Sequence, residues 1–327
     1  ILNYLFEHKT LNRQDAREVV SNITKGQYTD PEIAAFLTVY LMRSITLEEL
    51  SGFRDALLDS CIPVDLSAYD PMDLCGTGGD EKNTFNISTL SSFVAAGAGA
   101  YVAKHGNYSV SSSCGSSNVL EYYGYQFTRE EDKLKKQLEE THICFLHAPL
   151  FNPAMKNVAP VRKSLKLKTF FNMLGPMVNP AFVQKQMVGV FSLELARLYS
   201  YIYQDTGKQF VILHSLDGYD EISLTSDFKM VSNQMEQILS PAHLGLNRYQ
   251  AEDLFGGNSV EEAAGIFKQV LEGKGTPAQQ DVVVANAGIA LSCYYPDKSL
   301  KECVQMAKES LESKKALQCF QKLIELK

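Results

Sequence analysis

The chain has 327 residues, of which 45% are hydrophobic, and this is enough to bury one large core and a smaller second one. Its 31 basic and 38 acidic side chains give a formal net charge of -7, which argues against non-specific binding to nucleic acid or to anionic membranes. The longest mostly apolar run, residues 90–103, is shorter than the roughly 20 residues that a membrane-spanning helix needs.

The seven cysteines are odd in number and form no C-x-x-C pair, a usage typical of reduced core thiols rather than of a disulfide framework or a zinc site. The first eight residues lack the basic stretch and the cleavage site of a secretory signal. We therefore expect a cytoplasmic protein.

Residues 1–66 show helical periodicity throughout and predict a small helical domain of three or four helices. Pro31 suits the first turn of one helix, and Thr46 with Glu49 forms a capping box at the start of the next. The segment 31–43 is apolar almost all round. Because a small bundle covers only part of such a helix, we expect it to pack on the larger domain, on a second subunit, or on both.

After residue 66, short apolar or β-branched runs alternate with amphipathic segments, which predicts an α/β domain with a mostly parallel sheet. The expected strands are 72–75, 100–103, 143–147, 187–191, 209–214 and 221–224, and the expected helices include 129–140, 259–273, 278–293 and 300–326. The chain is thus predicted to have a small helical domain, 1–66, joined by part of 155–180, and a large α/β domain, 67–327.

The sequence Gly-Thr-Gly-Gly-Asp at residues 76–80, here called the glycine loop, follows the first predicted strand. Its glycines permit positive φ angles and allow backbone amides to approach an anion closely. This is the composition of a phosphate-binding loop.

Two more small and polar stretches follow. Ser88 and Thr89 stand just before the apolar segment 90–98, where a hydroxyl residue commonly caps a helix whose N-terminus attracts negative charge. The run from Lys104 to Ser117 suits a loop around a polyanion, with Lys104 as a point charge. A flexible surface loop is the alternative for any one stretch, and three in succession argue against it. Neither the P-loop motif nor the dinucleotide fingerprint occurs here.

Two adjacent carboxylates, Asp220 and Glu221, follow the predicted strand 209–214 through a short turn. Such a pair is repulsive unless a cation lies between its members, and beside a phosphorylated sugar Mg²⁺ suits that position. A solvated turn is the alternative. Arg162 begins a basic run, 162–168, and its guanidinium suits the carboxylate of a planar acid, although most such runs are solvated helix faces.

The motifs as a set resemble the anthranilate phosphoribosyltransferase family. They are GTGGD at 76–80, NIST at 86–89, KHGN at 104–107, LEYYG at 120–124, HAP at 147–149, NPAMK at 152–156, TFFNMLGP at 169–176 and DGYDE at 217–221. The likeness covers nearly the whole chain. It implies transfer of the phosphoribosyl group from phosphoribosyl diphosphate to the amine of anthranilate, a step of tryptophan biosynthesis.

The resemblance also implies roles for individual residues. Gly76, Asn107 and Arg162 match the anthranilate positions, and Ser88, Asp220 and Glu221 match positions that hold Mg²⁺, with two ions per subunit. The matching donor positions are Gly76, Gly79, Asp80, Thr84, Asn86, Ile87, Ser88, Thr89, Lys104, His105, Gly106, Asn107, Ser109, Ser111, Ser112 and Ser116.

Catalysis is expected to rest on positioning by Lys104, Asn107 and Arg162, without a covalent intermediate. His105 is not expected to act as a general base, because an aromatic amine is already uncharged near neutral pH. The partners implied are the two small-molecule substrates and a second copy of the chain bound through the helical domain. Neither nucleic acid nor a membrane is expected as a partner.

Three departures from the family pattern bear on the acceptor. Tyr108 stands where arginine is usual, Ser117-Asn118 replaces Ala-Asp, and residues 165–169 read LKLKT where Leu-Gly-x-Arg-Thr is usual. The resemblance therefore specifies the donor more closely than the acceptor. One alternative is a nucleoside phosphorylase, whose usual Lys-x-Ser is replaced by 104–106 here; another is a nucleic-acid-binding relative, which should be basic.

Overall fold

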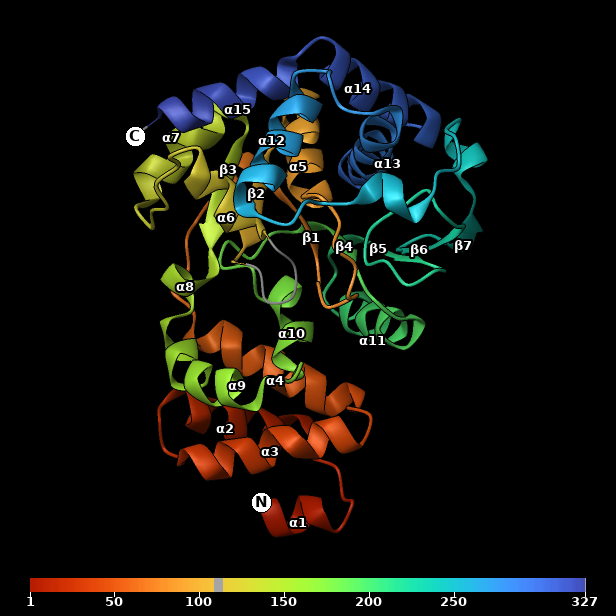
Figure 1. Ribbon diagram of the computed structural model, residues 1–327. Coiled ribbons are helices and arrows are strands. Elements are labelled where there is room, and N and C mark those ends of the chain that lie inside the picture. The colour runs from red at the N-terminus through yellow and green to blue at the C-terminus, as the bar shows by residue number, and fades with distance from the viewer. Residues whose placement is uncertain (109–113, 327) are drawn as a thin grey trace.

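The computed structural model describes residues 1–108 and 114–326, and Figure 1 shows two bodies joined through a central region. Residues 1–66 contain four α-helices, which lie in the lower body of that view. They are α1 (Leu2–Phe6), α2 (Arg13–Thr24), α3 (Asp30–Met42) and α4 (Leu47–Ser60). The predicted fold class, a small helical domain beside a larger α/β domain, is confirmed. The boundary between residues 66 and 67 stays a prediction.

A sheet forms the centre of the upper body, and in the described part of the chain it has seven strands in the order β3-β2-β1-β4-β5-β6-β7. They are β1 (Met72–Gly76), β2 (Val102–Gly106), β3 (Ile143–His147), β4 (Lys185–Gly189), β5 (Gln209–Ser215), β6 (Phe228–Ser232) and β7 (Glu236–Leu239). The first five strands pair in parallel, and β6 and β7 are antiparallel. The mostly parallel sheet is therefore confirmed.

One predicted strand is wrong. Residues 221–224 form a loop, because the side chain of Asn286 takes the place of a neighbouring strand. Its Oδ1 accepts a hydrogen bond from the Ile222 N–H at 3.0 Å, and its Nδ2 donates to the Ile222 carbonyl at 2.9 Å. The antiparallel hairpin of β6 and β7, which closes one edge of the sheet, was not predicted.

Helices cover both faces of the sheet, since alternate residues of its strands enter two different cores. On one face, α5 (Ile87–Gly97) and α13 (Pro277–Tyr294) pack in a core with Leu74 and Leu213. On the other face, α11 (Leu193–Gln204) packs with Val188 and Ile212. The remaining helices of the α/β body are α6 (Ser116–Tyr122), α7 (Glu131–Thr141), α8 (Ala148–Phe151), α12 (Val260–Leu271), α14 (Leu300–Glu312) and α15 (Lys315–Glu325). The single helical stretch predicted for 300–326 is two helices, separated at Lys314, whose φ is 62°.

Two short helices, α9 (Ala159–Leu165) and α10 (Phe171–Leu174), lie between the two bodies (Figure 1). Phe170, which precedes α10, stacks on Phe53 of α4 with ring centroids 4.4 Å apart. Val161 of α9 belongs to the same buried cluster as the helices of the lower body. This part of the predicted segment 155–180 therefore packs against the N-terminal helices.

No helix in the described part of the chain has the length and apolar character that crossing a membrane requires.

A buried glutamate organises the N-terminal helices. Glu49, the capping-box residue of α4, accepts hydrogen bonds from Arg43 at 2.6 and 3.0 Å, from Tyr40 at 3.2 Å, and from the amides of Leu11 and Thr46 at 3.0 Å. Burial opposes its ionisation, but the bonds from Arg43 and the amides outweigh burial and lower the pKa of Glu49. The folded structure thus stabilises the ionised form of Glu49.

Glu49→Gln is expected to lower the free energy of unfolding at neutral pH by about 3 kcal/mol, because it breaks a buried ion pair and leaves Arg43 without its partner. Since the folded-state pKa of Glu49 lies below its unfolded value, this stabilisation is present at neutral pH and disappears as the pH falls through the folded-state pKa. Chemical unfolding at several pH values measures it. The exposed neighbour Glu48→Gln is the control, with an expected change within about 0.5 kcal/mol; equal losses in both variants contradict the role of Glu49.

Candidate active site

A cavity of about 320 Å³ opens at the carboxyl ends of β1 and β2, the edge where parallel sheets commonly bind ligands. Its walls come from the glycine loop, the start of α5, the loop after β2, the segment of α9 and α10, and the loop after β5. The structure brings together fifteen of the predicted site residues along these walls: Gly76, Gly79, Asp80, Thr84, Asn86, Ser88, Thr89, Lys104, His105, Gly106, Asn107, Ser116, Arg162, Asp220 and Glu221.

Of the other four predicted residues, Ile87 is described by the structure and is not on the cavity wall. Ile87 has its side chain in the core, and its N–H donates to the Phe85 carbonyl at 2.6 Å. Ser109, Ser111 and Ser112 lie outside the described residues.

The glycine loop turns as its composition predicts, with φ of 63° at Gly78 and 80° at Gly79. The Gly78 N–H donates to Oδ2 of Asp220 at 2.6 Å. A Cβ atom at Gly76 would overlap the same carboxylate. The loop and Asp220 therefore fit closely, and only glycine leaves room for them at position 76.

The start of α5 repeats this arrangement with the second carboxylate. Asn86, not Ser88 or Thr89, is the N-cap residue, so the predicted hydroxyl cap is wrong by two positions, and Ser88 lies in the first turn. The Ser88 N–H donates to Oε1 of Glu221 at 2.8 Å. Because the helix has no acidic residue in its own first turn, Glu221 supplies the negative charge that a helix N-terminus favours.

Three carboxylates share this wall and disturb one another. Burial, with repulsion from Glu221 and Asp80, raises the pKa of Asp220 well above its usual value. Burial, with repulsion from Asp80, raises the pKa of Glu221 to about 7 against the bond from Ser88. Burial also raises the pKa of Asp80. A cation bound here would relieve the repulsion.

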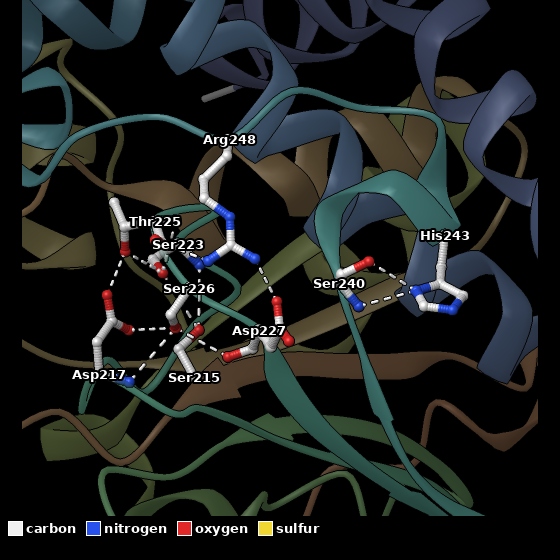
Figure 2. Close-up of polar contacts among 9 residues, drawn as sticks. All are labelled: Ser215, Asp217, Ser223, Thr225, Ser226, Asp227, Ser240, His243 and Arg248. Carbon is white, nitrogen blue, oxygen red and sulfur yellow. Dashed lines mark hydrogen bonds and ion pairs between the residues drawn. The ribbon is translucent and has the colours of Figure 1, made fainter.

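The loop that carries the two carboxylates is fixed by hydroxyl groups (Figure 2). Ser215 Oγ donates to the Glu221 carbonyl at 2.6 Å. It also accepts from the N–H of Ser223, the residue labelled beside it in Figure 2, at 3.2 Å. Farther along, Thr225 donates to the Asp217 carboxylate. Together with Asn286, which binds both backbone groups of Ile222, these contacts hold the acidic pair without a β-ladder.

The donor set fits magnesium only if a ligand completes it. Among the described residues, no group of three or more His, Cys, Asp or Glu side chains is placed to hold a metal ion by itself. Mg²⁺ commonly uses one or two carboxylates and takes its other oxygens from water and from substrate phosphates. Asp220 and Glu221 match this pattern.

Lys104 lies almost completely buried beneath the acidic pair. Its Nζ donates to the Leu74 carbonyl and lies 3.5 Å from the Ser88 hydroxyl. Burial lowers the pKa of Lys104, while the charges of Asp73, Glu221 and Asp220 oppose that effect. Lys104 thus brings its amine to the cavity wall from a buried position.

Arg162 points into the opposite side of the cavity from α9. Its Nη2 donates to Oδ1 of Asn172 at 3.2 Å, and its guanidinium lies 5.6 Å from the Phe171 ring centre. No carboxylate of the described residues forms an ion pair with it. A cation without an acidic partner beside an aromatic ring suits a planar anionic ligand.

Three cavity residues carry buried polar atoms for which the described residues provide no hydrogen-bond partner: Thr77 Oγ1, Asn86 Oδ1 and His105 Nε2. Such atoms are uncommon in folded proteins and indicate a ligand position. The His105 Nδ1 lies 3.1 Å from the Gly175 carbonyl, so this nitrogen carries the proton. Burial lowers the pKa of His105, which keeps the ring uncharged at neutral pH.

Comparison with known proteins decides the family. The helical bundle domain of the glycosyl transferase family matches residues 1–61, and its α/β domain matches residues 68–317. An anthranilate phosphoribosyltransferase of Christiangramia forsetii is 60% identical over 326 residues, which cover 100% of this chain and 98% of that protein. The chain belongs to the anthranilate phosphoribosyltransferase family.

Solved structures agree with this assignment. The anthranilate phosphoribosyltransferase of Thermus thermophilus is 32% identical, with a TM-score of 0.92 over 99% of this chain and 98% of that one. The enzyme of Saccharomyces cerevisiae, solved with phosphoribosyl diphosphate and Mg, is 27% identical, with a TM-score of 0.90 over 99% of this chain and 96% of that one.

Several residues on the wall of this family member's cavity were missed by sequence reasoning. Phe171 and Asn172 contact Arg162, and Lys82 lies 4.7 Å from the ring centre of Tyr219. The motif TFFNMLGP contained the first two, but its letters alone do not indicate which side chain meets Arg162.

The departures at Tyr108 and Asn118 have local partners in the fold. The Tyr108 hydroxyl donates to Glu121 at 2.6 Å, and its ring meets the edge of His147 with centroids 4.9 Å apart. Asn118 Oδ1 accepts from the Gly115 N–H at 3.0 Å at the start of α6. Both residues thus stabilise the wall formed by the loop after β2.

Gly189→Ala is expected to destabilise the protein by about 1–3 kcal/mol, because the new Cβ would overlap the Asp220 backbone carbonyl. Thermal unfolding measures the loss. Gly265→Ala is the matched control, since position 265 lies within α12 with nothing in the way of a Cβ, and alanine should stabilise that helix slightly. A Gly189→Ala protein as stable as the wild type would show that β4 does not support the acidic loop as described.

Proposed function

We infer that the protein transfers the 5-phosphoribosyl group from phosphoribosyl diphosphate to the amine of anthranilate. The products are N-(5-phosphoribosyl)anthranilate and diphosphate, and the reaction belongs to tryptophan biosynthesis. The observation that carries this inference is the cavity itself, which is lined by a glycine loop, an acidic pair and an arginine that has no acidic partner among the described residues. Full-length relatives with this name support it.

We propose that the donor lies along the glycine loop, the start of α5 and Lys104. Mg²⁺ would be held by Asp220 and Glu221 with the Ser88 hydroxyl, and we propose two ions per subunit. When bound, the metal neutralises charge on the diphosphate. The Gly78 and Ser88 amides bind the two carboxylates and would hold these metal ligands in position beside the donor.

We propose that anthranilate binds between Gly76, Asn107 and Arg162, with its carboxylate at the guanidinium. As the bond between C1 and the diphosphate oxygen breaks, the ribose gains positive charge and the leaving group gains negative charge. Lys104 and the loop amides stabilise the leaving group, and Arg162 with Asn107 holds the amine near C1. No general base is needed before the attack, because the aromatic amine is already uncharged near neutral pH. The nitrogen forms its bond to C1 as the bond to the diphosphate oxygen breaks, and it then loses one proton to water or to the departing diphosphate.

The test is consumption of anthranilate, followed by its fluorescence, with phosphoribosyl diphosphate and Mg²⁺. We expect turnover that depends on all three components. Phosphorolysis of thymidine and uridine is the control for the related phosphorylase activity. Turnover of those nucleosides with none of anthranilate would refute the proposal.

Arg162→Ala is expected to raise the KM for anthranilate about 10- to 100-fold, because a hydrogen-bonded charge that faces the acceptor is lost. The KM for the donor should change far less. Steady-state kinetics with each substrate varied measures both constants, and the exposed neighbour Lys163→Ala is the control. Equal increases for both substrates would contradict an acceptor role for Arg162.

Asp220→Asn combined with Glu221→Gln is expected to raise the Mg²⁺ concentration for half-maximal turnover by at least about tenfold, because neutral amides are weaker ligands of a hard cation. Calorimetric titration with phosphoribosyl diphosphate and Mg²⁺ provides a readout independent of turnover. Glu194→Gln, on exposed α11 surface, should leave the Mg²⁺ dependence unchanged. An unchanged Mg²⁺ requirement in the double variant would show that neither carboxylate binds the metal.

We propose further that the protein forms a homodimer through its helical domain. Leu41 and Met42 at the end of α3 are 41% and 81% exposed, and Tyr4 and Phe6 of α1 are also exposed. Apolar side chains gathered on one body favour a protein partner. Sedimentation should give a dimer whose dissociation constant rises in Met42→Glu, and a wild-type monomer at micromolar concentration would contradict this proposal.

A further inference from the structure

An ion pair joins Glu81, which follows the glycine loop, to Lys168 in the segment between α9 and α10. Lys168 Nζ lies 2.9 Å from Oε1 of Glu81 and 2.5 Å from the carbonyl oxygen of Gly79. The Lys168 methylene groups pack on the open side of Gly79, 3.7 and 3.8 Å from where a Cβ would be. One side chain thus contacts two residues of the proposed donor loop and its continuation.

Glu81 adopts a backbone conformation that glutamate rarely accepts. Its φ is 61°, in the left-handed region, which is unfavourable for a residue with a Cβ. The ion pair is exposed, and exposed ion pairs contribute little to stability. The stabilisation that the ion pair provides therefore does not offset the backbone strain at Glu81. Strained residues are commonly found at functional sites.

The two residues of the ion pair belong to different substrate positions: Glu81 to the proposed donor position and Lys168 to the proposed acceptor position. Glu81 directly follows Asp80, and the loop before it supplies the Gly78 amide to Asp220. Lys168 follows α9, whose Arg162 faces the acceptor side. Contact between the two segments is therefore contact between donor and acceptor positions.

We propose that Lys168 is a positioning residue for the donor: with Glu81 it holds residues 78–81 in the conformation that receives the diphosphate and fixes that loop against the acceptor segment. This inference rests on the proposed function. It also gives a role to Lys168 in a stretch where the sequence departs from the usual Leu-Gly-x-Arg-Thr.

For the variant Glu81→Gln, charge alone and loop positioning predict opposite changes in the affinity for the donor. Glu81→Gln removes a negative charge next to the site of a polyanionic donor, so by charge alone it should tighten donor binding. If the ion pair positions the loop, the same change frees Lys168 and Gly79 and weakens donor binding. Lys168→Gln weakens binding under either account.

The experiment is calorimetric titration of phosphoribosyl diphosphate with Mg²⁺ into the full-length wild type, Glu81→Gln, Lys168→Gln and the double variant, with kcat and both KM values measured in parallel. Each single variant should weaken donor binding roughly three- to tenfold. The double variant should bind the donor no more weakly than the single variant with the lower affinity. The KM for the donor should change more than kcat. Lys168→Arg should retain binding within about twofold, because a guanidinium also reaches both partners.

Two further variants separate positioning from general structural damage. Glu81→Gly removes the ion pair and relieves the strained φ, so it should weaken donor binding while thermal stability is unchanged or higher. Glu272→Gln breaks an exposed ion pair with Lys274 far from the cavity and should change neither donor binding nor KM.

Three results would overturn the inference: tighter donor binding in Glu81→Gln, unchanged binding in both single variants, or losses that add in the double variant. If the wild type turns over anthranilate but the variants give any of these results, only the ion-pair inference fails. A wild type that does not bind phosphoribosyl diphosphate at all overturns the proposed function and this inference together.

Discussion

Two backbone amides bonded to two adjacent carboxylates are the contact on which the rest of this site depends. The Gly78 amide binds Asp220 and the Ser88 amide binds Glu221, so one loop after β5 fixes both the glycine loop and the start of α5. The close fit leaves room only for glycine at positions 76 and 189. Burial raises the pKa of both carboxyl groups, with repulsion from Glu221 and Asp80 acting on Asp220 and repulsion from Asp80 acting on Glu221. The same contact that builds the cavity thereby makes it suited to a cation.

The opposite wall carries the complementary charge. Arg162 reaches the cavity from a segment that packs on the N-terminal helices, whereas the carboxylates come from the sheet. A ligand with a metal-bound anionic part and a separate carboxylate would therefore contact both bodies of the protein: the metal-bound part would lie at the carboxylates beside the sheet, and the carboxylate would lie at Arg162. Closing or opening the angle between the bodies would change the distance between the two substrates, and the Glu81 to Lys168 contact crosses that same gap.

Much of this arrangement was predictable from sequence, because glycines, hydroxyl residues and paired carboxylates at strand ends have few other uses together. The features that could not be predicted are contacts made by distant residues. The alternating polar and apolar residues 221–224 predicted a strand, but Asn286 from α13 and Ser215 from β5 hold them as a loop. Local propensity offered Ser88 as a cap, but the N-cap residue is Asn86, and the Ser88 amide instead binds Glu221, a residue distant in sequence. The β6–β7 hairpin was missed because its edge strand is largely exposed and lacks a continuous apolar run.

A crystal structure with diphosphate, Mg²⁺ and anthranilate, which cannot react with one another, tests the central claim most directly. The account predicts Mg²⁺ between diphosphate oxygens and the Asp220 and Glu221 carboxylates, with the anthranilate carboxylate within hydrogen-bonding distance of the Arg162 guanidinium. Diphosphate bound away from the glycine loop, or an anthranilate carboxylate on any other cation, would contradict it.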